Sequence, residues 1–137
     1  MKIKLILIIM LLALGAALIC APTLLLPQSE IAEIYMASGD GYKILSNPDE
    51  FYRLYTSGEF MGIRLEIAGN TLSAAEVMER LKVVRSRRSD AAGRECYYAY
   101  SPLTGAAVDL DGELVNVQIV KGENCLIVGI PLIMGSY

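Results

Sequence analysis

The sequence predicts an α+β protein, in which an N-terminal hydrophobic helix precedes a small antiparallel or mixed sheet of about four to five strands. One main helix is expected to pack on one face of that sheet. Three observations lead to this class. They are an uncharged run at Leu5–Leu26, alternation of apolar and polar residues in Glu59–Ala68 and Leu114–Val120, and a helix-capping pattern that begins at Ser73.

The run Leu5–Leu26 contains 22 residues without a charge and follows Lys2 and Lys4. A helix of this length reaches about 33 Å, which is enough to cross a bilayer core of about 30 Å. We therefore expect membrane attachment through Leu5–Leu26, either as a cleaved secretory signal or as an uncleaved anchor. The run is longer than the apolar part of most signals, about 7–15 residues, and this favours an anchor.

The distribution of charge predicts the orientation of such an anchor. Lys2 and Lys4 precede the apolar run, whereas the first charges after it are Glu30 and Glu33. The positive-inside rule then places the N-terminus in the cytoplasm and residues 28–137 outside, in a single-pass protein of the cell membrane. If the leader is cleaved, the protein is secreted. A bacterial cell envelope fits this pattern.

Three parts follow from these features: a signal anchor or signal peptide at residues 1–27, a juxtamembrane linker at 28–46 and an extracytoplasmic α+β domain at 47–137. Within the linker, Ser29 could alternatively cap a short helix, because Ile31, Ile34 and Tyr35 have i, i+3, i+4 spacing.

The domain itself carries the signals of several elements. Helices are predicted at Pro48–Thr56 and Ser73–Val84, and Arg85–Gly93 is predicted to be a flexible loop. Strands are predicted at Glu59–Ala68, Glu95–Ser101, Val108–Leu110, Leu114–Val120 and Cys125–Met134. Asn116 and Gln118 alternate with apolar residues, and we expect them on a polar, solvated face of their strand.

Composition excludes several kinds of function. The chain has 12 Lys+Arg and 15 Asp+Glu, a net charge of −3, and the basic surface that nucleic acid requires is not expected. It contains no His, which removes Ser-His-Asp and Cys-His catalysis and the commonest zinc ligand. We therefore expect no catalytic residues, no cofactor and no resident metal, and a role as a non-catalytic protein-interaction or structural module.

Two clusters offer an alternative role in binding anions or ions. Cations recur in Arg80–Arg88, and Arg85, Arg87 and Arg88 are candidates for contact with an anionic polymer or lipid headgroups. The simpler interpretation is cations at a helix C-terminus and a solvated loop. Asp109–Glu113 holds three alternating acids that resemble the start of a calcium loop, but Asp111-Gly112 is also a hairpin signal.

Two further features concern covalent pairing and partners. Cys96 and Cys125 could form a disulfide in an oxidising compartment, or could remain two small buried thiols. The apolar last strand, Cys125–Met134, could present an edge to which another envelope protein adds a strand, although Pro131 requires an edge, a bulge or a strand end.

Overall fold

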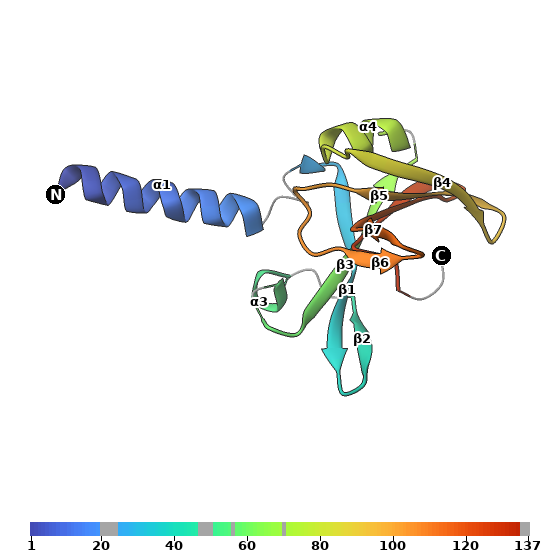
Figure 1. Ribbon diagram of the computed structural model, residues 1–137, viewed down its shortest axis with the longest axis horizontal. Coiled ribbons are helices and arrows are strands. Elements are labelled where there is room, and N and C mark those ends of the chain that lie inside the picture. The colour runs from blue at the N-terminus through green and yellow to red at the C-terminus, as the bar shows by residue number, and fades with distance from the viewer. Residues whose placement is uncertain (20–24, 47–50, 56, 70, 135–137) are drawn as a thin grey trace.

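The computed structural model describes the chain except for residues 20–24, 47–50, 56, 70 and 135–137. A long helix, α1 (Lys2–Ile19), projects from a body that is built mainly of strands (Figure 1). The body contains a seven-stranded antiparallel sheet in the order β2-β1-β3-β9-β8-β5-β4, and a separate two-stranded sheet of β6 and β7.

The bounds of the elements in the body are as follows. The strands are β1 (Ser29–Ser38), β2 (Gly41–Leu45), β3 (Phe60–Ala68), β4 (Arg85–Ala91), β5 (Arg94–Tyr100), β6 (Val108–Leu110), β7 (Glu113–Val115), β8 (Val117–Lys121) and β9 (Cys125–Ile130). The helices are α3 (Phe51–Tyr55) and α4 (Ala74–Arg80).

The predicted fold class is wrong in its balance of elements. The chain does mix helices and strands, but the body is mostly sheet, with seven strands in one sheet where four or five were expected. The additional strands come from two segments that the sequence pattern assigned elsewhere. Residues 28–46 were predicted to be a linker, and Arg85–Gly93 a loop.

The first of these errors has a physical cause in a β-bulge. β1 pairs with β3 from Ser29 to Met36, and its register shifts between Ile31 and Glu33. A bulge inserts one extra residue and reverses the alternation of side chains. Ile31 and Ile34 therefore both pack against the core although they are three residues apart, a spacing that resembles a helix.

The second error concerns β4, which is polar on both faces. A strand at the edge of a sheet needs no apolar side chains of its own, and charged residues are common there. Each residue of β4 lies opposite a residue of β5, from Arg85 with Tyr100 to Ala91 with Arg94.

The last strand, β9, is not at an edge as the sequence analysis suggested. It lies between β3 and β8, with Ile63–Ala68 on one side and Gln118–Lys121 on the other. Pro131 follows directly after the last residue of β9, which is one of the positions that proline permits.

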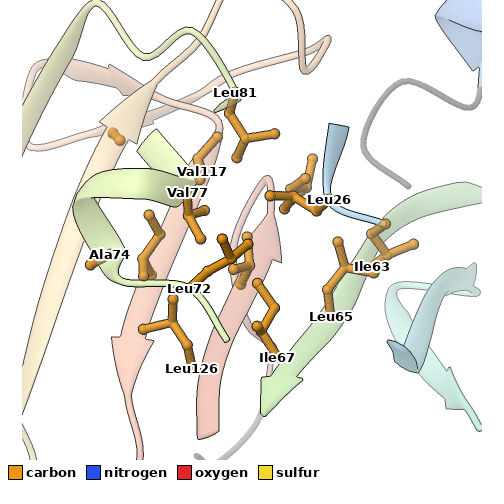
Figure 2. Close-up of a cluster of buried hydrophobic side chains, with 14 of the residues drawn as sticks. Leu26, Ile63, Leu65, Ile67, Leu72, Ala74, Val77, Leu81, Val117 and Leu126 are labelled. Atoms are coloured by element: carbon orange, nitrogen blue, oxygen red, sulfur yellow. The ribbon is translucent and has the colours of Figure 1, made fainter. Parts of the chain in front are cut away.

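The main core lies between one face of the sheet and α4 (Figure 2). α4 begins with the predicted capping box: the Ser73 hydroxyl accepts the Glu76 N–H, and the Glu76 carboxylate accepts the Ser73 N–H. The helix ends at Arg80, earlier than predicted, and buries Ala74 and Val77. α3 covers Phe51–Tyr55 of the predicted helix, and the other residues of that prediction, 48–50 and 56, lie outside the described residues.

Leu26 belongs to this core. Its side chain is 0% exposed, and it packs in one cluster with Leu81, Ile63 and Val117 (Figure 2). Leu25 packs against the same cluster. The end of the apolar run therefore forms part of the folded body, whereas the prediction assigned the whole run to a membrane.

α1 is apolar on all its sides, and its large side chains from Ile3 to Leu14 are exposed. In the part of the chain that the structure describes, no helix is long and apolar enough to cross a membrane. The predicted span at Leu5–Leu26 is corrected accordingly: the described helix ends at Ile19, and residues 20–24 of the predicted run lie outside the description.

The other face of the sheet carries a smaller core of Cys96, Val120, Ile127 and Ile133. The chain after β9 returns across this face, and the Ile133 N–H donates to the Gln118 side-chain oxygen at 3.0 Å. Gly129 permits this return, because a Cβ there would lie only 2.5 Å from the Ile133 nitrogen.

Candidate functional site

The free edge of β2 is the best candidate for a functional site. Among the strands that the structure describes, β2 pairs with β1 alone, through Ser38↔Gly41, Met36↔Lys43 and Ile34↔Leu45 and the pairs between them. Ser38 and Gly41 flank a two-residue turn, so they form a hydrogen-bonded pair, and such pairs alternate along an antiparallel ladder. The backbone groups of Tyr42 and Ile44 therefore point away from β1. In agreement, the Ala37 N–H points away from β2 and donates to the Glu59 carbonyl at 2.7 Å.

The side chains at this edge are apolar and accessible. Tyr42 is 45% and Ile44 42% exposed, and both project from the same face of the strand. The Tyr42 ring makes an edge contact with the buried Tyr35 ring, with 6.3 Å between centroids and 79° between planes. The edge is thereby held in a defined position by a rigid aromatic pair.

Tyr35, the buried partner of this pair, has a raised pKa. Burial, followed by the effect of its hydrogen bond to Glu33, raises the pKa of Tyr35 to about 12. Because the folded state holds this proton more tightly than the unfolded chain, the group stabilises the fold fully below pH 10, and that contribution is lost as the pH rises from about 10 to about 12.

We expect the Tyr35→Phe variant to lack this pH dependence. A pKa raised by about two units corresponds to about 2.7 kcal/mol at most. The free energy of unfolding of the unaltered chain should therefore fall, relative to that of Tyr35→Phe, by about 2 kcal/mol between pH 9 and pH 12. Urea unfolding at both pH values measures the difference. The Tyr42→Phe variant is the control and should lose as much stability between pH 9 and pH 12 as the unaltered chain. An equal loss in all three proteins would show that Tyr35 is not the source of the pH dependence.

The opposite edge, β4, carries the predicted anion-binding residues, and their guanidinium groups contact other residues of the protein. The Arg85 and Arg87 guanidinium groups stand over the rings of Tyr100 and Tyr98, at 5.4 and 5.5 Å from the ring centroids. Arg85 also donates to the Leu114 carbonyl at 2.8 Å, and the Arg87 Nε lies 3.3 Å from a Glu113 oxygen. These contacts give Arg85 and Arg87 a structural role in joining β4 to β5 and β7.

Arg88 projects to the other face and meets Glu95 at 3.7 Å. The Tyr97 hydroxyl donates to the same carboxylate, and the Lys121 Nζ approaches it to 3.2 Å. The Tyr97 bond first and the Lys121 bond second hold the pKa of Glu95 below its ordinary value, and the Glu95 carboxylate raises the pKa of Tyr97. The structure therefore does not bring Arg85, Arg87 and Arg88 together around one anion.

Asp109–Glu113 forms the predicted hairpin between β6 and β7. Asp111 and Gly112 both have positive φ, at 54° and 86°, and Asp109 accepts the Gly112 N–H at 2.8 Å. Since Glu113 pairs with Arg87, the three acids do not converge on one point. Within the described residues, no group of three or more His, Cys, Asp or Glu could hold a metal ion.

Cys96 and Cys125 are free thiols in this structure. They lie on β5 and β9, with β8 between these strands. Two strand spacings amount to about 10 Å, which exceeds the distance of about 4.4–6.8 Å between Cα atoms that a disulfide allows. Cys96 is buried and packs with Val120 and Ile127, whereas Cys125 is half-buried.

A cavity of about 180 Å³ lies at one end of the sheet. It is lined by Tyr55 of α3, Phe60, Met61 and Ile63 of β3, Thr104–Ala106, and Ile130–Pro131. Tyr55 and Phe60 stack with ring centroids 4.7 Å apart. The described residues of its lining include no carboxylate or cation, so the cavity resembles a receptor for an apolar group more than a catalytic cleft.

Asn116 and Gln118 were predicted to lie on a solvated face, but both are buried. The Asn116 side chain accepts the Ser101 N–H at 2.8 Å and donates to the carbonyls of Ser101 and Gly105 at 2.7 and 3.2 Å. The Ser101 hydroxyl in turn donates to the Leu81 carbonyl. The local sequence does not distinguish a buried, hydrogen-bonded asparagine from an exposed one, because the hydrogen-bond partners of Asn116 lie at least 11 residues away in the chain.

Comparison of the chain with protein families, with curated proteins and with solved structures finds no match. The geometry described above is therefore the sole basis for a functional assignment.

Proposed function

We propose that the protein is a non-catalytic interaction module, held at a membrane by its N-terminal segment, that receives an extended segment of a partner protein along β2. The observation that carries this proposal is the row of outward backbone groups at Tyr42 and Ile44. An extended peptide pairs with such groups through main-chain hydrogen bonds, and exposed side chains beside them provide selectivity.

The chemistry of the two edges favours β2 over β4. Charged side chains on an edge strand oppose the approach of a second strand, and β4 carries Arg85, Arg87 and Arg88. β2 has one charged residue, Lys43, which projects to the face opposite Tyr42 and Ile44. Its short length limits the interface to a few residues of the partner.

The apolar surface of α1 supports attachment to a membrane. A groove on a partner protein would cover one side of a helix, whereas α1 is apolar on every side. Lipid acyl chains can contact every side of an apolar helix that embeds in a membrane, and anionic headgroups are attracted to Lys2 and Lys4 at its start. Placement of the body outside the cytoplasm, in a bacterial envelope, is part of this proposal; two lysines followed by an apolar run support it, because this pattern is typical of a segment that directs export.

Photo-crosslinking from position 42 tests the role of β2. A benzoylphenylalanine at position 42 of the full chain should yield one dominant adduct in cells. An Ile44→Pro change should abolish that adduct, because it removes an outward N–H without breaking the ladder to β1.

The Ile44→Thr variant, which keeps the N–H and removes the same apolar side chain, is the matched control and should retain at least half of the adduct. A crosslinker at Ser89 on β4 should give none. If the adduct persists in Ile44→Pro, or if it also forms from Ser89, strand addition to β2 is not the mode of binding.

A further inference from the structure

The chain enters the folded body beside the C-terminal end of α4. The Gln28 side-chain oxygen accepts a hydrogen bond from Arg80 at 3.0 Å. Leu26 packs in one cluster with Leu81, the residue that caps α4. The Ser29 N–H and hydroxyl both bond to the Leu26 carbonyl, at 3.0 and 2.6 Å, and fix the direction of the chain at this point. The entry point therefore has a defined position on the body.

Only residues 20–24 separate this entry point from the end of α1 at Ile19. The six Cα–Cα steps from Ile19 to Leu25 reach at most about 21 Å, even in a fully extended chain. If α1 is embedded in a membrane, the body lies close to the lipid, and the end of α4 is near the point where the body is tethered.

That end of the body offers groups suited to a lipid interface. Arg80 is half-buried, and Lys82 is exposed. The Lys82 side chain makes no hydrogen bond or ion pair among the described residues, in contrast to the arginines of β4. Val84 is 70% exposed and could enter the boundary between headgroups and acyl chains.

We propose that Arg80 and Lys82 bind the headgroups of anionic lipids and orient the body on the membrane surface. This inference rests on the proposed membrane attachment of α1 and names a second contact of the same protein with the bilayer. The acidic residues nearest to Arg80 and Lys82 in the chain are Glu76 and Glu79 of α4; these and Glu30, two residues after Gln28, are exposed and reduce the attraction. Since acids outnumber cations in the chain, an anionic surface repels most of the body and selects this end.

Vesicle flotation of the full chain tests the proposal. Vesicles of phosphatidylcholine alone measure attachment through α1, and vesicles with 30% phosphatidylserine measure the additional anionic contact. Each cation near an anionic surface contributes about fivefold in affinity, so Arg80→Gln with Lys82→Gln should weaken the binding to anionic vesicles on the order of tenfold or more. Binding to neutral vesicles should change less than twofold.

The matched control removes two cations far from the entry point, Lys43 of β2 and Lys121, which lies near the N-terminal end of α4. Lys43→Gln with Lys121→Gln should change the anionic binding less than threefold. Lys82→Glu is a second test variant, because it leaves the Arg80–Gln28 bond intact; it should weaken the anionic binding at least fivefold with no change in melting temperature.

The outcomes separate the inference from the proposal on which it rests. If the unaltered chain fails to float with neutral vesicles, attachment through α1 is wrong, and the inference falls with it. If it floats but both test variants behave like the control on anionic vesicles, attachment stands and the headgroup contact is overturned.

Discussion

Replacing Leu26 with alanine is expected to lower the free energy of unfolding by about 3 kcal/mol. The Leu26 side chain is completely buried in the main core, among residues of the sheet and of α4. Truncation of a buried leucine costs about 2–5 kcal/mol, because it removes apolar contacts and leaves a cavity. Urea unfolding of the full chain in detergent measures the change.

Leu12→Ala is the matched control, since Leu12 belongs to the same apolar run but is 68% exposed in α1. We expect it to change the unfolding of the body by less than about 0.5 kcal/mol. A comparable loss of stability in both variants, or in neither, would show that Leu26 and Leu12 do not differ in their contribution to the folded body. Loss in Leu26→Ala alone places the start of the folded body inside the run.

Replacing Asn116 with alanine should also cost about 3 kcal/mol. The change removes three hydrogen bonds and leaves the N–H of Ser101, which is buried, without its partner. A buried polar group left unsatisfied costs about 1–3 kcal/mol, in addition to the bonds themselves. The loop after β5 should lose protection, and hydrogen exchange at the amides of Ser101 and residues 103–105 measures that directly.

Asn116→Asp serves as the graded comparison. It keeps the acceptor for the Ser101 N–H but loses both donated bonds and adds a buried charge, so it should destabilise the body as well. Asn124→Ala, at an exposed turn, should change stability by less than about 0.5 kcal/mol. If Asn116→Ala lowers the free energy of unfolding no more than Asn124→Ala does, the hydrogen bonds of Asn116 do not contribute to the stability of the fold.

Local signals in the sequence predicted local structure well. The capping box at Ser73 and the Asp111-Gly112 hairpin depend on residues within a few positions of each other, and both are present. The alternation in Glu59–Ala68 likewise corresponds to β3. Interactions of this range are determined by the chain segment itself and need no knowledge of the rest of the fold.

The errors arose where distant contacts decide the structure. The bulge in β1 is defined by its pairing with β3, and β4 is a strand because β5 provides its partner. An apolar run such as Cys125–Ile130 fits a central strand as well as an edge, so its place could not be inferred. The candidate site at β2 was missed for the same reason, since its hairpin fell in a segment that the pattern assigned to a linker or a helix.

The central position of β9 has a consequence for the order of events during synthesis. Residues 69–116 separate β3 from β8, and both strands pair with a strand that is synthesised after them. Until residues 125–130 leave the ribosome, the sheet consists of two incomplete halves with apolar edges. A nascent chain in that state exposes unpaired, apolar strand edges, and it is most prone to aggregate until the last strand joins the two halves.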